Sequence, residues 1–329
     1  MLKLLTNRSL LVFAVITLLL AVFPLIHNER ATMIVITHIF ILAVFAMSYD
    51  LLLGYTGIVS FGHVMFFGIG AYSVAIIMQK LGPTIPSLLL AVVIGAVLSA
   101  ILSYIVGMLS LRLKSHYYAM LTLAFSGLFL VIAEKWRSLT RGNDGFTFSI
   151  PDVLKDRLTF YYISFIVMII VFLMLRRFTQ SPLGRVLQSI RENEQRTQSL
   201  GYEIIHYKVI ASVVAGVAAS VSGALYVVTL RFVNTTVLAF DLNVDALLMT
   251  IIGGVGTLFG GILGAAIIEL AHEQLTSLAK VHWIFERWII FFGLLYILVV
   301  MLFPKGIVGT VRHWRDHRRD NISKNGRAK

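Results

Sequence analysis

Cysteine is absent from all 329 residues of the chain, and charged residues are scarce. Without cysteine there can be no disulfide framework, no thiolate nucleophile and no cysteine-ligated metal. Charged side chains make up 13% of the residues, against about 25% in an ordinary soluble domain. Hydrophobic residues reach 58%, and the mean hydropathy is +0.87. This balance excludes a soluble globular core and indicates a protein that crosses a membrane several times.

Sequence motifs for nucleotide binding and hydrolysis are also missing. No G-x-x-x-x-G-K-[ST] phosphate loop occurs, and the glycine-rich stretch Gly256–Gly261 lacks the lysine that would reach the phosphates. Neither G-x-S-x-G nor H-E-x-x-H is present, and nothing in the sequence orients His63 toward the nearby Ser60. We therefore expect no enzymatic chemistry in this chain. If ATP drives the protein, another chain must bind that ATP.

Long apolar runs are what the chain does contain, and they approach the roughly 17–25 residues needed to cross a bilayer. The predicted spans are Leu10–Ile26, Ala31–Leu53, Ile58–Met78, Ser87–Leu111, Tyr117–Ala133, Phe160–Leu175, Val209–Val228 and Ile284–Phe303. The first follows Lys3 and Arg8, as in a signal peptide, but no small-x-small cleavage site comes after it. We interpret it as a retained span.

A further run, Val244–Leu270, is interrupted by glycines, and its path decides the topology. With the N-terminus in the cytoplasm, the loop 135–159 falls outside and the basic loop 176–208 falls inside. If the run crosses once, the basic tail 310–329 ends outside. If it dips in and returns as a re-entrant pair, the net charge of +12 lies on the cytoplasmic face, as the positive-inside rule prefers. We predict this second arrangement, with one transmembrane domain over residues 1–309 and a cytoplasmic tail.

Two glycine-broken segments lie in opposite halves of the chain. They are Gly54-Tyr55-Thr56-Gly57-Ile58-Val59-Ser60-Phe61-Gly62-His63 and Gly253-Gly254-Val255-Gly256-Thr257-Leu258-Phe259-Gly260-Gly261. Backbone at membrane depth is irregular only where protein or a water-filled cavity covers it, so paired broken segments indicate a transport path. The alternative is that the glycines only let helices approach closely. The candidate path residues are Gly57, Ser60, Gly62, His63, Gly253, Gly254 and Gly256.

Polar residues near the first segment have open roles. His63 could bind a substrate carboxylate or relay protons, or it could be a buried histidine satisfied by the backbone. Asp50 could cap or pair structurally, or couple an ion. By contrast, Val209–Val228 carries two stripes of small residues at four-residue spacing, which predicts a helix packed closely on two neighbours.

The basic loop 176–208 contains the signals of a capped helix. Ser181 suits the N-cap, Pro182 suits the first helical position, and Gly201 suits a C-terminal stop. The segment between them has one apolar patch and many charges, so it is too polar to span. From these residues alone, the helix could lie on anionic lipid or dock against a cytoplasmic partner.

Three ordered segments resemble the LivM-type permeases, the membrane subunits of branched-chain amino acid ABC importers. They are the two glycine-broken segments and Ser181-Pro182-Leu183-Gly184-Arg185-Val186-Leu187-Gln188-Ser189-Ile190-Arg191-Glu192-Asn193-Glu194, which runs on to Leu200-Gly201-Tyr202. The resemblance covers the chain from about Ala31 to Gly309. It implies a heterodimer with a related permease, two cytoplasmic ATPase subunits that carry the ATP, and a periplasmic substrate-binding protein.

The resemblance also implies that the segment 181–201 is the ATPase-coupling loop. The usual Glu-Ala-Ala core of that loop is degenerate here, where Gln195-Arg196-Thr197 stands before Gly201. The residues assigned to coupling on this basis are Ser181, Gly184, Arg185, Arg191, Glu192, Glu194 and Gly201. Members of the family also import urea, other amino acids and aromatic acids, so the substrate does not follow from the resemblance.

The sequence as a whole predicts an all-α, polytopic transmembrane helical bundle with discontinuous or re-entrant glycine-rich segments. We expect a permease subunit in the bacterial inner membrane that forms half of the path for branched-chain amino acids or a similar small polar solute. We expect the chain itself to bind no cofactor, metal or nucleic acid. The alternative is an ion-coupled secondary transporter or channel without ATPase subunits, which the scarcity of deeply placed acids disfavours.

Overall fold

The computed structural model describes residues 20–24, 29–113, 115–279, 290, 293–294, 297–298, 301–302 and 306–310. The predicted first and last spans, Leu10–Ile26 and Ile284–Phe303, lie mostly outside these residues, as does the tail beyond residue 310.

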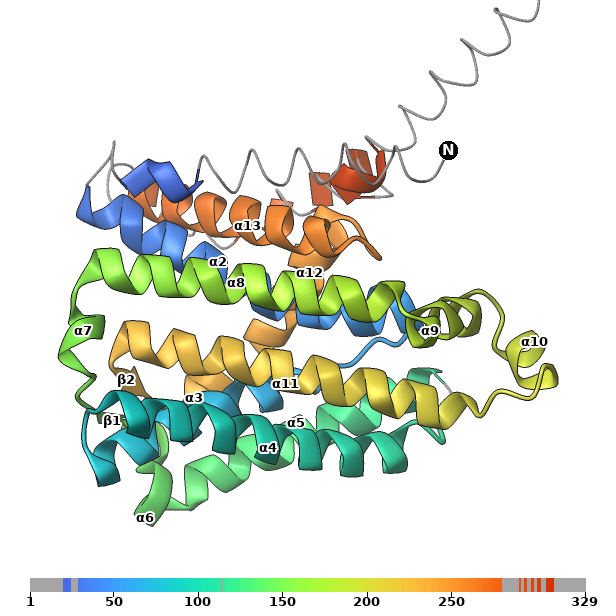
Figure 1. Ribbon diagram of the computed structural model, residues 1–329, viewed down its shortest axis with the longest axis horizontal. Coiled ribbons are helices and arrows are strands. Elements are labelled where there is room, and N and C mark those ends of the chain that lie inside the picture. The colour runs from blue at the N-terminus through green and yellow to red at the C-terminus, as the bar shows by residue number, and fades with distance from the viewer. Residues whose placement is uncertain are drawn as a thin grey trace, which may run out of the picture.

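The described chain is a bundle of long helices that run side by side (Figure 1), and the all-α prediction is confirmed. Within the described residues, seven helices are long and apolar enough to cross a membrane. Six of them correspond to predicted spans. These are α2 (Arg30–Asp50, continued by the π-helix η1, Leu51–Thr56), α3 (Val64–Leu81), α4 (Ile85–Ser110), α5 (Ser115–Lys135), α8 (Arg157–Gln180) and α11 (Ile204–Leu230). The seventh is α13 (Leu258–Ala279), which follows α12 (Phe240–Gly253).

The two ends of the bundle carry different short elements, and we name the ends after them. The ribbon end holds a two-stranded antiparallel ribbon, in which Phe146 pairs with Val233. The loop end holds two short helices that project from the bundle (Figure 1). The ribbon-end elements are α6 (Arg137–Thr140), η2 (Gly142–Asp144), β1 (Phe146–Thr147), α7 (Asp152–Lys155) and β2 (Phe232–Val233), with η3 (Thr235–Leu238) following. The loop-end helices are α9 (Pro182–Glu192) and α10 (Glu194–Ser199).

Helix α8 begins at the ribbon end with a side-chain cap. The Asp156 carboxylate accepts hydrogen bonds from the hydroxyl and the backbone N–H of Thr159, at 2.7 and 3.0 Å. These bonds favour the ionised carboxylate and lower the pKa of Asp156. The cap sets the residue at which this membrane-length helix starts.

The first broken segment shortens a predicted span. In the predicted span Ile58–Met78, residues 57–63 lie outside any helix and α3 begins only at Val64. The reason lies at Gly57, whose φ of 73° is left-handed and ends η1. Such a φ costs little for glycine alone. The glycine break itself was predicted, but apolar length alone does not report where the helix after it begins.

Helix α11 occupies the centre of the bundle, and its small residues explain why. Ser99 Oγ donates to the Gly216 carbonyl at 2.7 Å, and the Ser103 and Ser212 hydroxyls lie 2.9 Å apart. A Cβ at Gly223 would overlap the carbonyl of Phe67 in α3. The two predicted small-residue stripes therefore do pack against two neighbours, α4 and α3, at backbone-to-backbone range.

Helices α12 and α13 form an antiparallel hairpin that turns near the loop end. A Cβ at Gly264 would overlap the Met249 carbonyl, so the two helices touch through their backbones. Along α12, Thr250 Oγ1 donates to the Ala46 carbonyl of α2 at 3.2 Å. Along α13, Glu269 lies 3.5 Å from His38, nearer the start of α2. The hairpin thus comes from the ribbon side and runs back toward it, and α13 alone is long enough to cross a membrane.

Candidate functional site

The first broken segment is held by side chains from three separate helices. Asn243 of α12 is fully buried; its Nδ2 donates to the Ser60 carbonyl and its Oδ1 accepts from the Val64 N–H, both at 3.1 Å. Tyr49 of α2 donates its hydroxyl to the same Ser60 carbonyl at 2.9 Å. Thr122 of α5 accepts from the backbone N–H of the segment's residue 61 at 3.2 Å. Non-helical backbone in a membrane needs such partners, and this segment finds them from far along the chain.

His63 lies in an aromatic cage behind this segment. Its ring stacks on Phe45 with centroids 5.6 Å apart, and its Nε2 lies 2.8 Å from the Ser48 hydroxyl. Its Nδ1 is buried and has no hydrogen-bond partner among the described residues. The ring therefore has one polar edge that is satisfied and one that is open, inside a pocket of aromatic carbon.

Of the four path candidates in the first segment, the isolated chain exposes only Gly57. Ser60 is 2% exposed and His63 is fully buried. Gly62 is buried too, against the backbone of Thr122, where a Cβ would overlap the Thr122 carbonyl. We expected all four to face one central cavity. The structure instead puts Gly57 at a cavity wall and the other three in the packed layer behind it.

The second broken segment is a compact turn between α12 and α13. Gly254 and Gly256 adopt φ values of 124° and 81°, which side chains rarely tolerate. The turn supplies its own hydrogen bonds, including the Thr257 N–H to the Gly254 carbonyl at 3.2 Å. Gly253 lies against the Gly260 carbonyl, where a Cβ would overlap it. These glycines are explained by a tight turn and by close helix packing.

The two broken segments meet at one point, but away from Ser60 and His63. Gly256 packs on the backbone of Gly54, where a Cβ on Gly256 would lie 3.0 Å from the Gly54 carbonyl oxygen. Gly256 also donates its N–H to Asp50 Oδ1 at 2.7 Å. Residues 306–310 lie beside the same turn, since Gly306 approaches Gly254 closely. The meeting point is at the loop end of α2.

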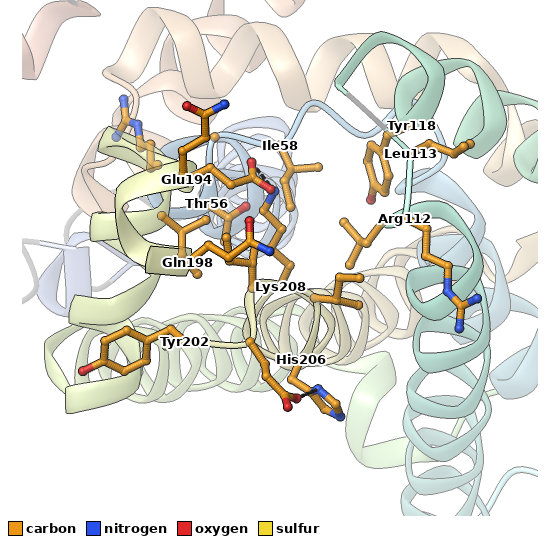
Figure 2. A pocket seen from close by; sticks show the side chains of 18 of the residues that line it. Thr56, Ile58, Arg112, Leu113, Tyr118, Glu194, Gln198, Tyr202, His206 and Lys208 are labelled. Carbon is orange, nitrogen blue, oxygen red and sulfur yellow. Dashed lines mark hydrogen bonds and ion pairs between the residues drawn. The ribbon is translucent and has the colours of Figure 1, made fainter. Parts of the chain in front are cut away.

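A cavity of about 1040 Å³ opens at the loop end between η1, α5, the α9–α10 loop and the start of α11. Figure 2 shows Tyr118 and Arg112 across the cavity from Glu194 and Gln198. This cavity brings Gly57, a candidate path residue, together with residues assigned to ATPase coupling. The predicted residues that line it are Gly57, Arg191, Glu194 and Gly201.

Tyr118 and Lys208 give this cavity two contrasting walls. Tyr118 is 5% exposed and lines the cavity, and its hydroxyl interacts with the Ser60 side chain, which does not line it. On the other wall, Lys208 Nζ pairs with Glu194 Oε2 at 2.9 Å. The cavity is therefore charged toward the loop and aromatic toward the bundle.

The coupling loop starts its helix at the predicted residue, but it forms two short helices, α9 and α10, where one was predicted. Ser181 caps α9 by accepting from the Gly184 N–H at 3.2 Å, and Pro182 is its first residue, as predicted. The prediction of one helix to Gly201 was wrong, because α9 ends at Asn193. Asn193 takes extended backbone and accepts from the Arg196 N–H at 2.9 Å, so it both ends α9 and caps α10. Gly201 does reverse the chain, with φ at 88°.

Helix α9 is anchored by an apolar face and presents charges outward. Leu187 and Ile190 are buried against Ile204 and Ala211 of α11. Gly184 fits tightly against the end of α8, where a Cβ would overlap the Thr179 carbonyl. The charged coupling candidates remain exposed. They are Arg185, Arg191, Glu192 and Glu194.

Asn243, Thr122 and Tyr118 are site residues that sequence reasoning missed. Asn243 stands immediately before Val244, the first residue of the predicted apolar run, and so lies just outside that run. A single amide within an apolar hairpin is the signal that could have found it. Thr122 and Tyr118 lie inside the predicted span Tyr117–Ala133 and carry no comparable signal.

Membrane-length helices around a broken segment, a loop-end cavity and an exposed capped helix together define a multi-pass membrane transport subunit. Comparison with known proteins agrees. Residues 31–301 match the family described as "Branched-chain amino acid transport system / permease component". The chain belongs to this family, whose members are permease subunits of ABC importers and not enzymes.

Individual relatives carry the same description. The high-affinity branched-chain amino acid permease protein LivM of Escherichia coli K12 is 24% identical, over 91% of this chain and 75% of its own. A probable LivM of Methanocaldococcus jannaschii is 25% identical, over 80% of this chain and 89% of its own. An autoinducer 2 permease protein, LsrC of Photorhabdus laumondii, is 27% identical over 47% of this chain and 48% of its own. No solved structure matches.

Within the described residues, no group of three or more histidine, aspartate and glutamate side chains could hold a metal ion. The polar groups of the site are hydroxyls, one amide, one imidazole and backbone carbonyls. Such groups suit the reversible binding of a polar solute.

Proposed function

We propose that this chain forms half of the translocation path of a bacterial inner-membrane importer for branched-chain amino acids or a similar small zwitterion. The other half is a related permease in a heterodimer. Two cytoplasmic ATPase subunits bind and hydrolyse the ATP, and a periplasmic binding protein delivers the solute. The observation that carries the proposal is the loop-end cavity, which joins Gly57 of the path to Arg191 and Glu194 of the coupling loop.

The path in this proposal runs along the first broken segment. Tyr118 on the cavity wall contacts the Ser60 side chain, and the same segment carries His63 with its open Nδ1 and is bonded by the Asn243 amide. A zwitterion needs donors for its carboxylate and acceptors for its ammonium, and an imidazole beside backbone carbonyls supplies both. The aromatic cage offers an apolar surface for a branched side chain.

Coupling in this proposal runs through α9. Its apolar face fixes the helix to α11, so a force applied from outside is passed to the bundle and not absorbed by a loose loop. Its exposed charges suit contact with a groove on an ATPase subunit. Reversing Glu192 and Glu194 with Glu192→Lys and Glu194→Lys should reduce ATPase association at least about tenfold, the equivalent of about 1.4 kcal/mol.

The matched control for these reversals is Asp152→Lys, which changes the same charge at the exposed ribbon end. Membrane insertion should be normal in all three variants. The docking assignment fails if both glutamate reversals leave substrate-stimulated ATPase activity at the wild-type level.

Sidedness follows from the same proposal, with the loop end in the cytoplasm and the ribbon end in the periplasm. The chain has no cysteine, so single thiols can be added without background. Ser149→Cys on the ribbon side and Ser189→Cys on α9 are both exposed positions. An impermeant thiol reagent should label Ser149→Cys in intact spheroplasts and Ser189→Cys only after lysis. Ser323→Cys in the tail should behave like Ser189→Cys, and the reverse result would refute the re-entrant topology.

The decisive experiment is purification of the tagged chain from its native membrane, followed by reconstitution. We expect a related permease and two ATPases to co-purify, and uptake of radiolabelled leucine to require ATP and a binding protein. Uptake by this chain alone, driven by an ion gradient, would replace the proposal with a secondary transporter. Identification of the ligand held by the binding protein then names the solute.

A further inference from the structure

Three chain segments converge on a single buried carboxylate at the loop end of the bundle. Asp50, the last residue of α2, accepts the Gly256 N–H at 2.7 Å from the turn between α12 and α13. Gly54 of η1 lies one turn after Asp50, and its carbonyl accepts a hydrogen bond from Nη1 of Arg191 in α9. Helix α9 and both glycine-broken segments therefore meet within one hydrogen-bonded cluster, which we call the junction. Its members are Asp50, Gly54, Arg191 and Gly256.

The junction contains a buried carboxylate, Asp50, that is only partly hydrogen-bonded. Asp50 is fully buried, and its second oxygen, Oδ2, has no hydrogen-bond partner among the described residues. A buried carboxylate is costly unless a positive group offsets it. Arg191 interacts electrostatically with this carboxylate, and its Nη1 reaches the Gly54 carbonyl from the charged, exposed face of α9.

The Gly54 carbonyl is free to accept this arginine because of where its helix ends. The last carbonyls of a helix lack partners within the helix, and η1 stops at Thr56. Gly54 also leaves no room for a side chain, since a Cβ there would overlap Asp50 Oδ1 and the Gly256 nitrogen. A small cavity of about 550 Å³ lies beside the junction. Tyr55 of η1 and Gln188 of α9 line it, together with Arg191.

We propose that the junction is the link through which α9 moves both glycine-broken segments together, with Asp50 and Arg191 as its positioning residues. This inference rests on the proposed ATP-driven transport but is separate from it. Because Arg191 bonds the first segment and Asp50 ties the second segment to the first, a displacement of α9 is carried to both. Neither residue needs to touch the solute.

The test is a double-mutant cycle in the assembled transporter, with uptake per ATP hydrolysed as the readout. Asp50→Asn keeps an oxygen for the Gly256 N–H and removes only the charge. Arg191→Gln removes the guanidinium from an exposed helix. Each single variant should lower uptake per ATP about tenfold, and the double variant should be no worse than either, because residues in one network are not additive. Arg157→Gln, an equal charge loss at the exposed start of α8 on the ribbon end, should leave the ratio unchanged.

Three results would overturn the junction. They are an unchanged ratio in both single variants, a double variant with about a hundredfold loss, as expected of independent sites, and an equal loss in Arg157→Gln. If wild-type uptake proves independent of ATP, the proposed function itself is wrong. That result differs from the three above, in which ATP-driven uptake stands and only the junction is refuted.

A second measurement covers the case in which Asp50→Asn does not assemble. In the Arg191→Gln variant, Tyr55→Cys and Gln188→Cys place two thiols on the small cavity. Joining them with a short bifunctional thiol reagent should restore uptake per ATP, because a covalent link replaces the lost bond between α9 and the first segment. A bridge that forms without restoring the ratio refutes the inference.

Discussion

The two glycine-broken segments look alike in sequence, yet the structure satisfies them in opposite ways. The first, 54–63, depends on side chains from three helices outside it: Asn243, Tyr49 and Thr122 bond its backbone. The second, 253–261, bonds mainly to itself, as in the Thr257 hydroxyl to the Gly254 carbonyl at 2.6 Å. A segment held by distant partners can change when those partners move. A self-bonded turn keeps its shape.

The glycines also serve different purposes in the two segments. In the first, Gly57 is needed for its left-handed φ, and its space is partly open to the loop-end cavity. In the second, Gly253 brings two helix backbones together. Close packing alone therefore accounts for Gly253. The first segment is the better candidate for the moving, solute-contacting part, while the path role of the second remains a prediction.

Gly253→Ala should have the largest effect on stability. Its Cβ would overlap the Gly260 carbonyl, so α12 and α13 must separate. We expect a loss of about 3 kcal/mol, the upper part of the range for overpacking, seen as loss of monodisperse protein in detergent. Gly107→Ala is the matched control, since its Cβ meets neighbours at an ordinary 3.4 Å. Equal stability of the two variants would contradict the scaffold role of the second segment.

Asn243→Leu should come next and should act on the first segment. The Val64 N–H loses its acceptor, while the Ser60 carbonyl keeps Tyr49 as a donor. One orphaned buried group costs about 2 kcal/mol. Thermal unfolding in detergent measures this loss, and uptake should fall more than membrane abundance does.

Thr250→Val is the control on the same helix. It also removes a buried hydrogen-bonding group, but its hydroxyl donates to carbonyls already used by helices. If both variants lose the same stability, the first segment is not specially dependent on its distant amide.

Gly57→Ala should destabilise less but impair transport more selectively. A left-handed φ costs an alanine roughly 1–2 kcal/mol. Gly82 at the ribbon end also has a positive φ, 86°, with ψ at 165°, a region open essentially to glycine alone, so Gly82→Ala should lose at least as much stability. Only Gly57→Ala should reduce uptake by the assembled transporter. If uptake falls equally in both, backbone strain and not position is responsible.

Ser60→Ala should have the smallest structural effect. Asn243 and Tyr49 hold its backbone carbonyl, which alanine retains, so the stability loss should be about 1 kcal/mol or less. The half-saturating solute concentration should rise while the maximal rate is kept. Ser99→Ala, which removes a buried hydroxyl between α4 and α11, should leave that concentration unchanged. A fall in maximal rate with unchanged half-saturation would remove Ser60 from solute binding.

Long helices and local caps could be predicted from the sequence because both depend on neighbours along the chain. Apolar length gave six of the seven described spans, and Ser181 with Pro182 gave the start of α9. The break at Asn193 was missed for a local reason: an asparagine among helix formers can end one helix and cap the next. Gly201 still reversed the chain where expected.

The site itself could be predicted only in part. The broken segments were visible as glycine in an apolar run, but their partners were not. Thr122 lies 61 residues from the segment it bonds, and Asn243 lies 183 residues from Ser60. The burial of His63 and Ser60 likewise depends on which helices cover them. Such pairings arise from tertiary packing, which a single sequence does not encode by spacing.

The central place of α11 has a consequence for how the protein is made. Ribosomes deliver α2, α3 and α4 to the membrane first, and about 90 residues separate the end of α4 from Ile204. At roughly 5–20 residues per second, these helices wait about 5–20 seconds for α11. During that time Gly70, which will lie against the Ser220 carbonyl, and the Ser99 hydroxyl have no partner. A nascent chain stopped before Ile204 would contain five of the seven described membrane-length helices and would lack the one helix against which α2, α3 and α4 all pack.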